Sequence, residues 1–110
     1  MSDARLDLSA MMRQAQELSE KLRRVQEELR HRTVSATVGG GLVEVIANGA
    51  LELVGVRIDP QAVDPRDVEM LQDLVRAAAN QALVRAKQLA QDAMQKAAGV
   101  PLPFGPGGGA

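Results

Sequence analysis

The sequence predicts an α+β fold of order α-β-β-β-α, in which two long helices flank a three-stranded antiparallel meander. Three observations support it: an apolar heptad pattern at the start, three short extended runs bounded by glycine-containing turns, and an alanine-rich helical pattern after them. The chain has 110 residues, which suits a single small domain. We expect this domain to span residues 1–98 and a Pro/Gly-rich tail, 99–110, to be disordered.

The first helix is predicted from an apolar seam whose members follow one another in alternating steps of four and three residues. This is the most regular periodicity in the chain, and it is sustained for nearly four heptads between Ala4 and His31. Such a helix has about 25 residues and is nearly 40 Å long, more than one small domain can cover. The seam consists of Ala4, Leu8, Met11, Ala15, Leu18, Leu22, Val25 and Leu29.

The charged residues of this helix project away from the seam. Acidic and basic residues alternate there at i,i+4 spacing, which favours a solvated face with intrahelical ion pairs. Arg13 is the exception, because no acidic residue stands four positions before it. The expected pairs are Glu17 with Lys21, Glu20 with Arg24, and Glu28 with Arg32.

Three extended runs follow, at Thr33–Val38, Leu42–Ala47 and Ala50–Asp59. The run Gly39 to Gly41 predicts a tight turn between the first two. Asn48-Gly49 predicts a two-residue type I′ turn between the second and third, since that turn needs positive φ at both central positions.

The third run changes the parity of its apolar residues. Leu51 and Leu53 have one parity, whereas Val54, Val56 and Ile58 have the other. A bulge near Gly55 would explain the change, and so would burial of both faces of the strand.

The second helix is predicted to begin at Asp64-Pro65-Arg66-Asp67, with Asp64 as N-cap, proline at the first helical position and an acid near the helix start. It should reach about Ala97 and stop at Gly99. Its small side chains allow a neighbouring helix or sheet to approach closely. Its apolar stripe is Val68, Leu71, Val75, Ala78, Ala82, Ala86, Leu89 and Ala93.

The composition argues against an enzyme. The chain has no cysteine and one histidine, His31, so it lacks a thiolate nucleophile and a recognisable metal-ligand set. No Gly-Lys pair is present for a phosphate-binding loop, and the triple glycine leads into a strand rather than a helix. We therefore expect no catalytic residue, cofactor, metal or small-molecule substrate.

The same composition bears on location and partners. No apolar run suggests a secretion signal or a membrane span, so a cytoplasmic protein is expected. The chain has one Phe and no Trp or Tyr, so its core should be thin, and a homodimer that shares its core would enlarge it. The lack of aromatic residues also argues against base stacking as the mode of nucleic-acid binding.

The ordered set of segments resembles the YbaB/EbfC family of bacterial nucleoid-associated proteins. The residues that carry the resemblance are MMRQAQELSEKLRRVQEEL, GGGLVEVIANGALELVGVRIDP and DVEMLQDLVRAAANQAL, which together cover most of the chain. The resemblance implies a homodimer with projecting helical arms, shaped like tweezers, that holds double-stranded DNA. It also implies a nucleoid location, a supporting role in nucleoid organisation, gene regulation or DNA repair, recombination or repair proteins as further partners, and no catalytic site.

Charge and outward direction, rather than a matched family motif, select the candidate DNA-contacting residues. The segment 1–32 holds seven basic against six acidic residues, and 61–98 holds five against five, so weak and salt-sensitive phosphate binding is expected. The alternative is an assembly module whose arms bind protein, with incidental or no DNA contact. The candidates are Arg13, Lys21, Arg23, Arg24 and Arg30 on the first helix and Arg85, Lys87 and Lys96 on the second.

Overall fold

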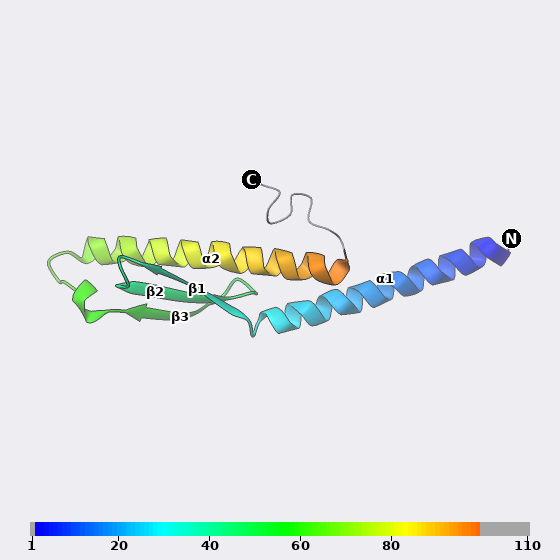
Figure 1. The fold of residues 1–110 in the computed structure, drawn as a ribbon, viewed down its shortest axis with the longest axis horizontal. Coiled ribbons are helices and arrows are strands. Elements are labelled where there is room, and N and C mark those ends of the chain that lie inside the picture. The colour runs from blue at the N-terminus through cyan, green and yellow to red at the C-terminus, as the bar shows by residue number, and fades with distance from the viewer. Residues whose placement is uncertain (1, 100–110) are drawn as a thin grey trace.

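The structure, a computed structural model, describes residues 2–99, with side chains from Asp7 onward. The predicted order is confirmed, with one short 3₁₀ helix added (Figure 1). The predicted tail, except Gly99, lies outside the described residues. The elements are α1 (Ser2–Leu29), β1 (Thr33–Val38), β2 (Val43–Asn48), β3 (Leu53–Ile58), the 3₁₀ helix η1 (Pro60–Ala62) and α2 (Val68–Ala98).

The molecule is elongated, with principal extents of 78 × 31 × 17 Å. At one end α2 lies along the antiparallel sheet, whose strand order is β1-β2-β3, and α1 runs antiparallel to the last part of α2 and continues beyond it as an arm (Figure 1). The arm exists because the heptad helix is longer than the surface available to cover it.

The core between α2 and the sheet is thin. The largest fully buried side chains are Val43 and Val45 of β2, and the buried residues of α2 are alanines, with partly buried leucines packed beside them. These alanines recur every four residues and so share one face of the helix, which brings the α2 backbone close to β1 and β2. The alanines are Ala78, Ala82 and Ala86.

Two sequence predictions about the meander are confirmed. Gly39, Gly40 and Gly41 form the turn between β1 and β2, all with positive φ. The pairing of β2 with β3 shifts register between Ile46 and Ala47, which leaves Val54 as the extra residue of a bulge beside Gly55.

The predicted type I′ turn is wrong. Asn48 is the last residue of β2, and a longer loop to β3 places Leu51, not Gly49, at positive φ (64°). The Asn48 side chain organises this loop: its Oδ1 accepts from the backbone N–H groups of Ala50 and Glu52 at 3.0 and 3.1 Å. A side chain that bonds its own loop offers the backbone an alternative to the two-residue turn.

Gly49 has a different role from the one predicted. It lies against the end of α1, where its N–H donates to the carbonyl oxygens of Leu29 and Arg32 at 2.8 and 3.0 Å. A Cβ at Gly49 would lie 2.6 Å from Leu29 Cδ2. The glycine is therefore required for close approach, and this contact joins the arm to the sheet.

The start of α2 also differs from the prediction. Asp67, not Asp64, is the N-cap, and its side chain accepts from the N–H of Met70 at 3.2 Å. Asp64 instead accepts from the N–H of Arg66, so residues 64–67 form a turn before the helix. The predicted stop at Gly99 is confirmed, with left-handed φ of 70°.

Candidate nucleic-acid interface

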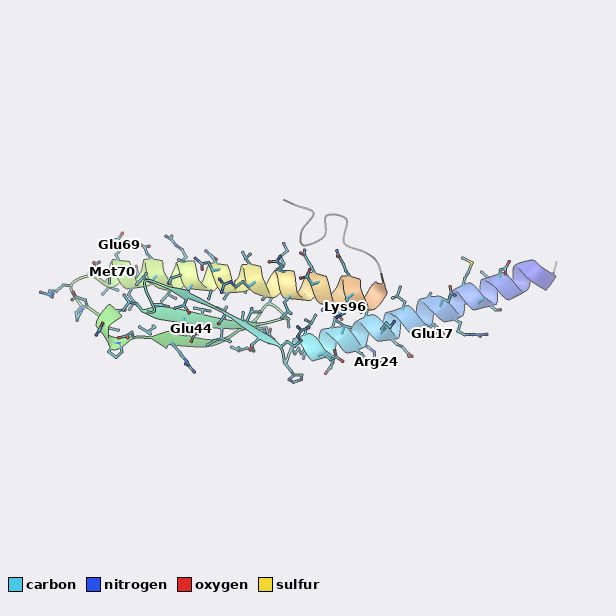
Figure 2. The ribbon with its side chains drawn as sticks, viewed as in Figure 1. Glu17, Arg24, Glu44, Glu69, Met70 and Lys96 are labelled. Carbon is cyan, nitrogen blue, oxygen red and sulfur yellow. The ribbon has the colours of Figure 1, made fainter. Side chains whose placement is uncertain are left out.

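The outer side of α1 carries the first group of candidate residues. Arg13, Arg23 and Arg24 are exposed and, by the heptad spacing, lie away from the apolar seam. Figure 2 shows Arg24 and Glu17 on the part of α1 near and beyond the end of α2. These guanidinium groups can reach a ligand without displacing any packed part of the molecule.

The predicted intrahelical ion pairs of α1 are not formed. Among the described side chains, ion pairs join only Arg57 with Glu44, Arg66 with Asp64 and Arg76 with Asp73, all in the sheet, the turn and α2. Exposed pairs contribute little, so the long side chains of α1 gain little from being held together. The described basic groups of α1 therefore lie among acidic residues but form no ion pair with any described side chain.

Arg30 lies just beyond α1, because the helix ends at Leu29 rather than at His31. Its carbonyl oxygen accepts from Asn48 Nδ2 at 3.2 Å, which ties this turn to the β2-β3 loop. Its side chain is exposed beside a cavity of about 340 Å³ between α1, that loop and α2. His31 is exposed in the same turn.

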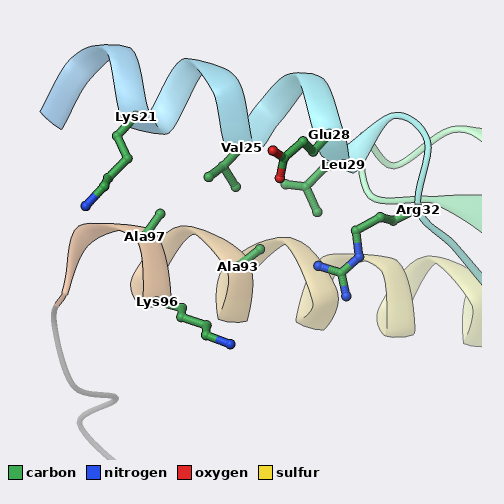
Figure 3. Close-up of a pocket in the computed structure, with 8 residues that line it drawn as sticks. All are labelled: Lys21, Val25, Glu28, Leu29, Arg32, Ala93, Lys96 and Ala97. Atoms are coloured by element: carbon green, nitrogen blue, oxygen red, sulfur yellow. The ribbon is translucent and has the colours of Figure 1, made fainter. Parts of the chain in front are cut away.

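A second cavity, of about 330 Å³, lies between α1 and the end of α2 (Figure 3). Lys21 and Lys96 line it, so the fold brings together two candidates that are far apart in the sequence. Arg32, which sequence reasoning treated only as an ion-pair partner, is a third basic residue there, and Glu28 is the one acidic residue. The side chains that line this cavity carry a net charge of +2, three positive against one negative.

The two remaining candidates lie on α2 over the sheet. Arg85 donates a hydrogen bond from Nη1 to the carbonyl oxygen of Ser35 on β1. β1 is an edge strand, so Arg85 supplies a hydrogen-bond donor at the edge of the sheet. Lys87 is exposed. The candidates thus form three groups: the arm, the α1-α2 junction and the body.

Within residues 2–99, no three His, Cys, Asp or Glu side chains gather in a way that could hold a metal ion. Neither α1 nor α2, as far as the chain is described, combines the length and apolar character that a membrane crossing requires.

A model of the YbaB/EbfC DNA-binding family matches residues 4–100. The chain belongs to this family. Two bacterial members, both called nucleoid-associated proteins, align over 93 residues, which is 84% of this chain and 89% of each relative. The protein of Pelotomaculum thermopropionicum is 47% identical, and that of Moorella thermoacetica is 50% identical.

A similar fold is seen in the crystal structure of the uncharacterized protein HP0035 from Helicobacter pylori. The two chains superpose with a TM-score of 0.68 at 23% sequence identity, covering 76% of this chain and 88% of the other. This likeness concerns the fold alone. Because the family is a DNA-binding family, DNA is the partner to consider for the exposed basic residues.

Proposed function

We propose that this protein binds double-stranded DNA as a homodimer on the bacterial nucleoid, mainly through phosphate contacts, and so supports nucleoid organisation, gene regulation or DNA repair. The observation that carries the proposal is the outer side of α1, where Arg13, Arg23 and Arg24 are exposed and form no ion pair with any side chain that the structure describes. An unpaired guanidinium on a projecting helix is available for phosphate oxygens at little conformational expense.

Binding of this kind depends on counterion release. Each phosphate that a side chain neutralises makes log K fall by about 0.9 per decade of salt. The junction cavity with Lys21, Arg32 and Lys96 supplies further contacts beside the arm. Because acidic residues lie among the basic ones and the net charge is −1, affinity should be modest and should fall steeply with salt.

Dimerisation is supported by an uncovered apolar strip on β3. Val56 and Ile58 pair with Val45 and Val43, so they lie on the sheet face that α2 covers over β1 and β2. They are nevertheless 49% and 40% exposed, as is Leu53 at 47%. A second copy that packs on this strip would enlarge the thin core. Val56→Lys should then lower the mass measured by sedimentation while α2 stays packed on the sheet.

The test of DNA binding compares two triple variants with equal loss of charge. Arg13, Arg23 and Arg24 are replaced by Gln in the first, and the ion-paired Arg57, Arg66 and Arg76 in the second. Fluorescence anisotropy with a labelled duplex at several salt concentrations gives affinity and salt slope. We expect the arm variant to lose most of its affinity and to reduce the slope by roughly 2 to 3 per subunit, while the control keeps the slope of the unmodified protein.

Two results would contradict the proposal. Absence of binding by the unmodified protein even at low salt would reject DNA as the ligand and leave the assembly-module alternative, which the exposed apolar side of α1 favours. Equal losses in the two variants would mean that net charge alone, rather than the arm, determines binding.

A further inference from the structure

The apolar seam of α1 continues past the helix that covers it. Towards the body, Val25 and Leu29 of this seam line the cavity against Ala93 and Ala97 of α2, and Leu29 is buried. α2 then ends at Gly99, opposite this part of α1. The outer seam residues, which we call the distal seam, are exposed. They are Leu8 (58%), Met11 (64%), Ala15 and Leu18 (41%).

The shape of the distal seam defines what can cover it. It has the same heptad spacing as the part that packs on α2, so its complement is another helix with small and apolar residues at matching steps. Four apolar positions on a straight exposed helix are an unusual surface for an arm that only contacts phosphate. We propose that the distal seam binds the distal seam of a second copy of this chain, with the two helices antiparallel.

Charge complementarity favours a second copy of α1 as the partner of the distal seam, and it favours the antiparallel direction. An antiparallel pair that sets Leu8 opposite Leu18 of the second copy also sets Asp7 opposite Lys21 of the second copy. By symmetry this ion pair forms twice, with Gln14 facing Gln14 between them. A parallel pair would place Asp7 beside Met12 and Lys21 beside Gln26, and so would form neither ion pair.

The antiparallel direction also fits the end of α2. Since α2 runs antiparallel to α1, the incoming helix would run in the direction of α2, with its part from Asp7 onward lying beyond the end of α2 (Figure 1). The seam of α1 is thereby covered along its length, first by α2 and then by the second copy.

Arm pairing leaves the outer side of α1 accessible. Arg13, Arg23 and Arg24 face away from the seam, so each paired arm can still contact DNA. Two copies overlap by about 20 Å, from Asp7 to Lys21, and their bodies lie at opposite ends. Arm pairing itself does not require DNA. If the protein binds DNA as proposed above, one pair of arms can bridge two duplexes, and this consequence rests on the proposed function.

The first experiment measures self-association of the full chain without DNA by sedimentation velocity over a range of protein concentrations. Leu18→Glu places a charge in the distal seam and should remove the largest species, whereas the control Gln16→Glu adds the same charge on the other side of α1. Both sites are exposed, so circular dichroism should show unchanged folding. Identical sedimentation of Leu18→Glu and the unmodified protein would overturn the proposal.

The second experiment tests direction. Asp7→Lys or Lys21→Asp alone replaces two attractive contacts by two repulsive ones and should weaken association about tenfold. The double variant restores both pairs with reversed sign and should recover the original association. Failure of the double variant to recover would refute the antiparallel arrangement.

The third experiment addresses the other candidate occupant, the chain's own segment 100–110. Truncation after Gly99 should leave arm pairing unchanged. If the shortened chain associates and the full chain does not, that segment competes for the distal seam and the proposal fails. Val56→Lys should leave arm pairing intact, so loss of the β3 dimer and loss of arm pairing can be told apart.

Discussion

The contact between Gly49 and the end of α1 gives the sharpest test of how the arm is attached. In Gly49→Ala the new Cβ would lie 2.6 and 2.8 Å from Leu29 Cδ2 and Cβ, and 2.9 Å from the Leu29 carbonyl oxygen. Leu29 is 3% exposed, and its carbonyl accepts the Gly49 N–H at 2.8 Å. Neither partner can withdraw without loss of packing or of this hydrogen bond.

The size of the effect follows from these contacts. Overpacking at a close contact costs about 1–3 kcal/mol, and weakening the bonds from the Gly49 N–H to the Leu29 and Arg32 carbonyls adds about 1 kcal/mol. We expect about 2–3 kcal/mol of destabilisation. For a domain of this length, that lowers the melting temperature by roughly 10–20 °C. Circular dichroism melts at matched protein concentrations provide the measurement.

Gly55→Ala is the matched control. At that position the nearest atom is Ile46 Cδ1, 3.0 Å from the new Cβ, and it is the end of a flexible side chain. Neither Gly49 nor Gly55 has positive φ, so the two substitutions differ in contact and not in backbone strain. Gly55→Ala should cost less than about 1 kcal/mol. Equal melting temperatures for the two variants would refute the close approach of the loop to α1.

Two further predictions concern the same loop. Asn48→Ala removes a 4% exposed side chain whose amide donates to the Arg30 carbonyl and the Glu52 carboxylate. Urea unfolding should therefore show a free energy of unfolding lower by about 2–4 kcal/mol. As a control, Asn80→Ala at an exposed position should change this free energy by less than about 0.5 kcal/mol. Leu51→Gly removes the backbone strain of a leucine at φ 64° and should stabilise the protein by about 1 kcal/mol, which raises the melting temperature by a few degrees. A lower melting temperature would mean that the half-exposed Leu51 side chain contributes more to stability than its backbone strain costs.

Local patterns in the sequence were sufficient for the elements of the fold. The heptad seam, the glycine turn, the bulge near Gly55 and the stop at Gly99 each depend on residues close together in the chain, and all four are confirmed. Local competition explains the errors. The side chains of Asn48 and Asp64 each bond to their own loop, which lengthened the β2-β3 connection and moved the start of α2 to Asp67.

The candidate site was less accessible to sequence reasoning. Outward direction on α1 could be read from the spacing, and Arg13, Arg23 and Arg24 are exposed there. Arg32 was missed as a site residue because its neighbourhood with Lys21 and Lys96 depends on how α2 returns along α1. The bond from Arg85 to Ser35 joins residues 50 positions apart, and no local pattern predicts it.

The sequence by itself determined the helices, the meander, the family and the length of an arm too long to be covered, because periodicity and turn chemistry act over a few residues. Only the tertiary structure decided how much of that arm α2 covers, which basic groups meet at the junction, and why Gly49 must be glycine. Those properties depend on contacts between segments that are distant in the chain. There the distance between two backbones, rather than the type of either residue, determines which side chains fit.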